Sequence, residues 1–143
     1  MKNSLIRILP QRFPAFVVVG AVGFVVDASI LAILVHGYQW GDYTARLVSF
    51  AFAVTVTWLL NRSYVFASTR THNRRSEYTR YLTVQGMGMA INFLVYSLCI
   101  ASNQLMDKWP VLALAVGSIV ALIFNYAGAR VFVFTGETNQ PKD

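Results

Sequence analysis

The sequence has 143 residues, of which 56% are hydrophobic and only 13% are charged, and its formal net charge is +6. About a quarter of the residues in a soluble domain are charged, so this composition, with a mean hydropathy of +0.51, excludes an ordinary soluble protein. The single cysteine, Cys99, excludes a disulfide framework, and its position inside an apolar run argues against a metal site.

Four long apolar segments account for this composition. A bilayer core needs about 20 mostly apolar residues in one helix. A soluble four-helix bundle needs a polar face on every helix, whereas these segments are apolar on all sides. We therefore predict an all-α integral membrane protein, with four transmembrane helices at about residues 13–36, 45–66, 81–101 and 109–134.

The predicted helices follow one another through short connections. Helix one holds a single charged residue, Asp27, near its middle. Helix two ends in Asn61-Arg62-Ser63-Tyr64-Val65-Phe66 and leads into residues 67–80, an arginine-rich segment that we predict as a loop. Helices three and four are joined by a brief loop at 102–108.

The second half of the chain repeats the pattern of the first. A shift of 68 residues places Ser49 on Gly117, Thr57 on Asn125 and Arg62 on Arg130, and a shift of 65 places Gly20, Gly23 and Asp27 on Gln85, Gly88 and Asn92. Self-similarity at a fixed shift indicates repeated structural units. We predict a single membrane domain over residues 1–143, built from two parallel two-helix repeats at about 13–66 and 78–134.

The basic residues predict the orientation of the chain. Ten of the twelve Lys and Arg lie in the amino-terminal segment, at or near residues 62–80, or near the carboxyl end. The remaining two, Arg46 and Lys108, lie at the connections after helices one and three. Because basic segments stay in the cytoplasm, we expect both termini and the middle segment to face inward. The net positive charge is explained by this topology, so we expect no binding to nucleic acid.

Four stretches resemble the GtrA family: FVVVGAVGFVVDASILAILV, ARLVSFAFAVTVTWLLNRSYVF, YLTVQGMGMAINFLVYSLCI and FNYAGARVFVF. The most specific parts are Gly20 with Asp27, and the Asn61-Arg62-x-aromatic-x-Phe66 ending of helix two. The resemblance covers about residues 13–134. In the usual family pattern the second repeat also ends in Asn-Arg, whereas here Ala129 precedes Arg130.

This resemblance implies translocation of a polyprenyl-phosphate-linked sugar across the bacterial cytoplasmic membrane, for glycosylation of cell-envelope polysaccharides. Two other functions stay open: a non-catalytic scaffold that recruits a glycosyltransferase partner through residues 67–80, and a small multidrug-type exporter, which the fixed orientation disfavours. Nothing in the sequence predicts an enzyme, a cofactor or a metal site. Because four helices enclose little volume, we also expect a homo-oligomer.

Seven residues are candidates for contact with such a substrate: Asp27, Arg46, Asn61, Arg62, Asn92, Asn125 and Arg130. Guanidinium groups bind phosphate in a bidentate manner, so Arg62 and Arg130, at equivalent inner helix ends, are predicted to clamp it. The alternative is that both are simply positive-inside anchors. For Asn61 and Asn125, substrate contact and hydrogen bonds between helices are both open.

Asp27 is the candidate with the strongest physical argument. An acid in the middle of a membrane costs at least a few kcal/mol and is functional by default. It could bind sugar hydroxyls, pair with Arg46 or take up a proton. It could also be a protonated acid that ties helices together through Asn92 or Ser49. Asn92, its counterpart in the second repeat, cannot ionise, which excludes a symmetrical two-acid proton site within one chain.

Overall fold

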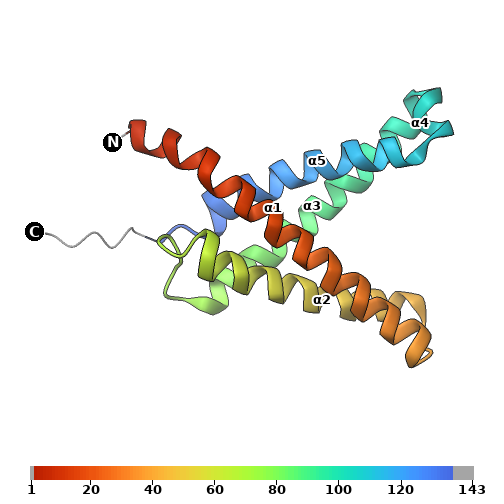
Figure 1. Cartoon of the computed structure of the whole chain (residues 1–143), viewed down its shortest axis with the longest axis horizontal. Helices are drawn as coiled ribbons and strands as arrows, with labels where there is room; N and C mark the ends of the chain where they lie inside the picture. Colours follow the sequence, from red (N-terminus) through yellow and green to blue (C-terminus); the bar gives the residue numbers. More distant parts are fainter. Residues whose placement is uncertain (1, 137–143) are drawn as a thin grey trace, which may run out of the picture. The chain divides into compact units, whose positions relative to one another are not determined.

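The structure, a computed structural model, describes residues 2–136, and the regular secondary structure in this range is helical. Residues 137–143 of the predicted domain lie outside it. The elements are α1 (Lys2–Ala32), a π-helical turn (Ile33–Gly37), α2 (Asp42–Leu60), a second π-helical turn (Asn61–Val65), α3 (Arg74–Ser102), α4 (Gln104–Lys108), α5 (Pro110–Gly128) and a third π-helical turn (Ala129–Val133) (Figure 1).

Four helical segments are long and apolar enough to cross a membrane: Arg12–Gly37, Asp42–Val65, Arg74–Ser102 and Pro110–Val133. This confirms the predicted all-α membrane fold. Many large apolar side chains face outward, and Phe24, Leu47 and Phe93 are 73%, 71% and 72% exposed. Such surfaces are rare on soluble monomers, but they suit contact with lipid or with another membrane helix.

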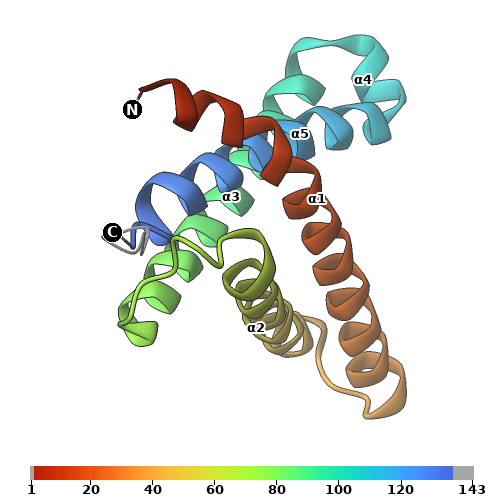
Figure 2. The ribbon, with the colours of Figure 1, turned by 60° about the vertical axis from the view of Figure 1, so that its left-hand side comes forward.

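The described residues divide into two compact units. Unit 1 contains residues 2–70 and Gly136, and unit 2 contains Thr71–Thr135. In unit 1, α1 and α2 form an antiparallel pair, and in unit 2, α3 and α5 do the same, with α4 in their connection (Figures 1 and 2). Each unit therefore contains two of the four membrane-spanning segments.

The same aromatic contact closes both units. In unit 1, Phe16 packs edge-on against Phe66, with 6.3 Å between ring centroids. In unit 2, Tyr81 packs against Phe134 at 6.1 Å. Tyr81 lies 65 positions after Phe16 and Phe134 lies 68 positions after Phe66, so these contacts follow the two shifts seen in the sequence. All four rings are buried.

Small residues allow the helices of each unit to approach closely. The buried positions of α2 include Ala45, Ser49 and Ala53, and those of α5 include Ala113, Gly117 and Ala121, again 68 positions apart. A methyl group added at Gly23 would lie 2.3 Å from Thr57 Cγ2. Close approach of this kind is how membrane helices gain packing energy without a hydrophobic driving force between them.

This packing gives a first testable prediction. A Cβ at Gly117 would lie 2.8 Å from the backbone carbonyl oxygen of Asn92, which cannot move without displacing α3. Overpacking of this kind costs about 1–3 kcal/mol, so Gly117→Ala is expected to lower the thermal midpoint in detergent. Gly86→Ala is the matched control, because a Cβ at Gly86 meets nothing within 4 Å. Equal midpoints for the two variants would contradict the observed helix contact.

Helix α3 begins at Arg74, seven residues before the predicted start at 81, so the second half of the predicted arginine-rich loop is helical. The cause is a polar cap that an apolar-run argument overlooks. Asn73 Oδ1 accepts a hydrogen bond from the Ser76 backbone N–H at 3.1 Å, which is typical of a helix start. The buried Glu77 carboxylate accepts from the Thr71 N–H at 2.7 Å and from its hydroxyl at 3.0 Å.

Two further boundaries differ from the sequence prediction. Helix α1 begins at Lys2, not near residue 13, and continues through Pro10 and Pro14. Each proline removes one backbone donor, but the surrounding Leu, Ile, Arg and Gln residues have adequate helix propensity. The brief loop predicted at 102–108 contains α4, whose start is capped by Asn103 Oδ1, which accepts from the Leu105 N–H at 2.9 Å.

Candidate functional site

An ion pair lies within the membrane-spanning part of unit 1. Arg46, in the second turn of α2, donates from Nη1 to Asp27 Oδ2 on α1. The Asp27 side chain is 15% exposed and the Arg46 side chain is 50% exposed. Of the partners that the sequence leaves open for Asp27, the structure therefore places Arg46 against it. Ser49 donates instead to the Arg46 carbonyl oxygen at 3.1 Å.

The second carboxylate oxygen of Asp27 has no hydrogen-bond donor among the described residues. Asp27 Oδ1 is buried and accepts no hydrogen bond from the residues that the structure describes. A buried acceptor without a donor costs about 1–3 kcal/mol. Arg46 therefore donates to only one of the two carboxylate oxygens of Asp27.

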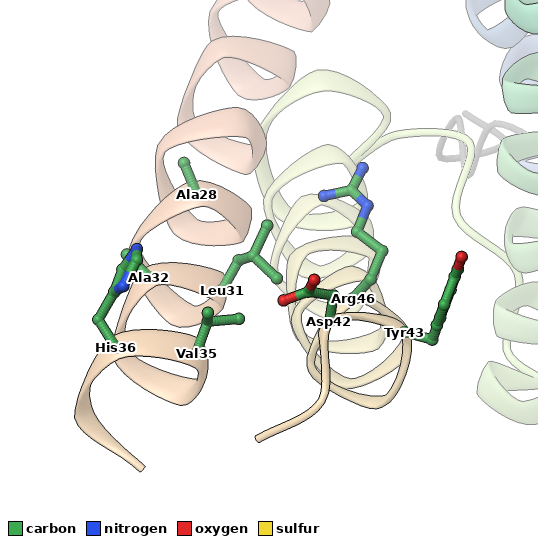
Figure 3. Close-up of a pocket in the computed structure, with 8 residues that line it drawn as sticks. All are labelled: Ala28, Leu31, Ala32, Val35, His36, Asp42, Tyr43 and Arg46. Atoms are coloured by element: carbon green, nitrogen blue, oxygen red, sulfur yellow. The ribbon is translucent and has the colours of Figure 1, made fainter. Parts of the chain in front are cut away.

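A cleft of about 530 Å³ opens between α1 and α2 beside this ion pair (Figure 3). Leu31 projects into it from α1 and Val35 from the π-helical turn that follows α1 (Figure 3). Its apolar wall, on α1 and the π-helical turn after it, consists of Ala28, Leu31, Ala32 and Val35. Its polar lining consists of His36, Asp42, Tyr43 and Arg46. An apolar wall next to a half-exposed guanidinium suits a ligand that combines an apolar chain with an anionic group.

Three of the four polar residues that line this cleft were not predicted from the sequence. His36, Asp42 and Tyr43 lie in or next to the segment that was interpreted from the sequence as a connection between helices. The available signal was the spacing of Asp42 and Arg46, because residues four apart share one face of a helix. Recognising that signal required knowing that α2 begins at Asp42 and not near residue 45.

Unit 2 has uncharged residues at the positions that correspond to the ion pair. Asn92 corresponds to Asp27, and its Nδ2 donates to Ser118 Oγ at 3.2 Å. The shift of 68 places Leu114 where unit 1 has Arg46. The predicted asymmetry between the repeats is thus one of charge: unit 1 holds the ion pair and unit 2 holds an amide–hydroxyl hydrogen bond.

Asn125 also connects two helices of unit 2. Its Nδ2 donates to Gln85 Oε1 on α3 at 3.3 Å, and its side chain lies so close to Gly88 that a Cβ there would be 2.0 Å from Asn125 Oδ1. The hydrogen bond between helices, one of the two roles that the sequence leaves open for Asn125, is therefore present in the structure.

Arg62 and Arg130 lie on equivalent π-helical turns, Asn61–Val65 in unit 1 and Ala129–Val133 in unit 2. Arg62 is 7% exposed, and its guanidinium carbon lies 5.9 Å from the centroid of the Trp58 ring. Asn61 is buried, as is Ala129 at the same position of unit 2. Each unit therefore has an arginine on a π-helical turn. Single π-helical turns occur frequently at functional sites.

Comparison with known proteins agrees with this architecture. Residues 15–140 match the family model described as GtrA/DPMS, transmembrane domain. No curated protein matches the chain significantly. Among the residues that the structure describes, no group of three or more His, Cys, Asp and Glu side chains could hold a metal ion.

Proposed function

Because the chain belongs to the GtrA/DPMS transmembrane-domain family, we propose that it moves a polyprenyl-phosphate-linked sugar across the bacterial cytoplasmic membrane. Members of this family are membrane proteins of lipid-linked sugar processes, and they are generally small translocation proteins rather than enzymes. The sugar would then be available for glycosylation of cell-envelope polysaccharides.

The observation that carries this proposal is the Asp27–Arg46 ion pair beside the cleft between α1 and α2. The cargo has an isoprenoid chain, a phosphodiester and a sugar. The apolar wall suits the chain, Arg46 suits the phosphate, and a carboxylate such as Asp27 can accept hydrogen bonds from sugar hydroxyls. Charged residues within a membrane span are functional candidates by default.

Arginines near both ends of α2 support passage of a phosphate from one side to the other. Arg46 and Arg62 are sixteen residues apart, which corresponds to about 24 Å along a helix. The hydrocarbon core is about 30 Å thick. We propose that Arg46 receives the phosphate near the outer surface and Arg62 near the cytoplasmic one, with Asn61 beside Arg62. In unit 2, Arg130 has the same place on its π-helical turn.

The test is a headgroup-accessibility assay with purified protein in sealed vesicles that contain a defined polyprenyl-phosphate sugar. We expect the protein to make the sugar of the inner leaflet accessible to an external reagent within minutes. Vesicles without protein and vesicles with Arg46→Gln are the controls. Accessibility no greater than in the protein-free vesicles would overturn the proposal.

A second candidate function is a scaffold that recruits a glycosyltransferase. The observation that favours it is the exposed pair Arg74 and Arg75 at the start of α3, which could bind an acidic surface of a partner. Purified protein would then fail in the vesicle assay, and transfer of the sugar would require the enzyme. Under either proposal we expect a homo-oligomer, because the exposed apolar faces of the units could pair with those of a second copy.

Orientation gives a second testable prediction. In a Cys99→Ser background, cysteines at Gly41 and Asn103 are expected to react with a membrane-impermeant maleimide added to intact cells. A cysteine at Thr71 is expected to react only after the cells are opened, since basic segments remain in the cytoplasm. Labelling at Thr71 in sealed cells would contradict the proposed orientation, with both termini in the cytoplasm.

A further inference from the structure

The charges around the cleft do not favour an anion as they stand. Asp42 and Arg46 line the cleft, and Asp27 contacts Arg46 from beside it. These three groups together have a net charge of −1 when they are ionised and His36 is neutral. A phosphodiester would raise this to −2 in or near a medium of low dielectric constant, where like charges repel strongly. An anion therefore needs a compensating positive charge to bind here.

The Arg46 guanidinium can supply that positive charge. The Arg46 guanidinium contacts Asp27 and also lines the cleft, and its side chain is half exposed. It can therefore turn from the carboxylate to a ligand by rotation of its own side chain. Asp27 would then lose the guanidinium that it contacts, while its Oδ1 already lacks a donor among the described residues. A bare carboxylate in that position is strongly unfavourable, whereas a carboxylic acid is not.

We propose that a lipid phosphodiester takes over Arg46 from Asp27, and that Asp27 binds one proton in the same step. The proton comes from water and adds to a carboxylate oxygen of Asp27. Arg46 remains a cation throughout, and no covalent bond other than this O–H is formed or broken. The net charge of the cleft is then −1 both before and after the ligand enters. The proposal rests on the proposed function only for the identity of the lipid.

Few other groups could take up this proton. On α2, the charged or titratable side chains that line the cleft are Asp42, Tyr43 and Arg46, and on the Ile33–Gly37 turn there is His36. Arg62 and Tyr64 lie on the Asn61–Val65 turn, at the far end of α2. Because unperturbed His titrates near neutral pH, His36 is the alternative that the experiment must exclude.

The experiment is titration calorimetry of the detergent-solubilised protein with a farnesyl phosphodiester of glucose, at pH 6.5. Its phosphate has one negative charge across the neutral range, so the ligand itself exchanges no proton. Binding heats in two buffers of different ionisation enthalpy give the number of protons taken up. For the wild-type protein we expect uptake approaching one proton per ligand.

Three variants identify the group that binds the proton. Asp27→Asn is expected to take up no proton and to bind at least about fivefold more tightly, because the competing carboxylate is gone. Arg46→Gln is expected to bind at least about tenfold more weakly. His36→Gln is expected to retain the proton uptake. Thermal midpoints of all variants show that they are folded.

Several results would overturn the inference. They are wild-type binding without proton uptake, uptake that persists in Asp27→Asn or disappears in His36→Gln, unchanged binding by Arg46→Gln, and no binding at all. Equal uptake with farnesol, which has no charge, would also overturn it. Phosphatidylglycerol distinguishes the sources of the phosphodiester: equal affinity and uptake would support a site for lipid phosphodiesters in general.

Failure of this inference can be told apart from failure of the proposed function. If the sugar lipid crosses vesicle membranes but binds without a proton, translocation stands and the exchange at Arg46 does not. If binding shows the proton and its dependence on Asp27, yet no sugar lipid crosses, the exchange stands and translocation does not.

Discussion

Asp27→Asn is expected to reduce translocation of the sugar lipid at least about tenfold while the protein still folds and inserts. Asparagine has nearly the same shape and can hydrogen-bond, and unit 2 already has Asn92 at this position. Without the negative charge of Asp27, the Arg46 guanidinium is no longer drawn away from the phosphodiester. The phosphodiester is therefore expected to remain bound. The measurements are the vesicle assay and the thermal midpoint in detergent. Removing a charge from the span is expected to leave the midpoint equal or slightly higher.

Asp107→Asn is the matched control, because the same chemical change is made on α4, which contributes no residue to the lining of the cleft. It is expected to translocate like the wild-type protein. Unchanged translocation by Asp27→Asn would return Asp27 to a purely structural role. Aggregation of that variant would instead show that the ion pair with Arg46 is needed to hold α1 against α2.

Arg62→Gln is expected to have the second large effect, a loss of translocation of about tenfold or more. A guanidinium binds phosphate through two parallel hydrogen bonds and an amide cannot replace it. Arg62→Lys is expected to retain partial activity, because the charge remains while the fork geometry is lost. Arg130→Gln and Arg130→Lys test the equivalent position of unit 2 in the same assay.

Burial of Arg62 makes a stability control necessary. Arg62 is 7% exposed and its guanidinium lies over the Trp58 ring, so Arg62→Gln also removes packing and a cation–π contact. The thermal midpoint separates these losses from the loss of phosphate binding. Arg75→Gln, at an exposed position of α3, removes the same charge without such contacts. Normal translocation by a correctly inserted Arg62→Gln protein would show that this residue only anchors the helix.

The four membrane spans could be predicted from the sequence because a run of about twenty mostly apolar residues indicates a transmembrane helix. Their ends could not, because polar contacts set them. The apolar pattern of helix three fades near Tyr81, yet α3 begins at Arg74 because Asn73 caps it and Glu77 binds the backbone of Thr71. The π-helical turns were not predicted either, since a change in hydrogen-bond register leaves no mark on a pattern of apolar residues.

The candidate site was predictable in part. Asp27 was singled out because a lone acid in an apolar run is costly, and Arg46 was among its possible partners. The sequence could not decide between partners because both units contain short polar side chains at the right helical spacing. The cleft could not be predicted from the sequence. His36 and Tyr43 line it because a π-helical turn follows α1 and because α2 begins at Asp42.

The ion pair also sets an order of events while the protein is being made. Arg46 follows Asp27 by 19 residues. At a synthesis rate of about 5–20 residues per second, it follows about 1–4 s later. During that interval a newly made α1 contains an acid with no cation to meet it, and its release into lipid is disfavoured. We therefore expect helix α1 to stay beside the insertion machinery until the first two turns of α2 emerge, and we expect the two helices to enter the bilayer together as a hairpin.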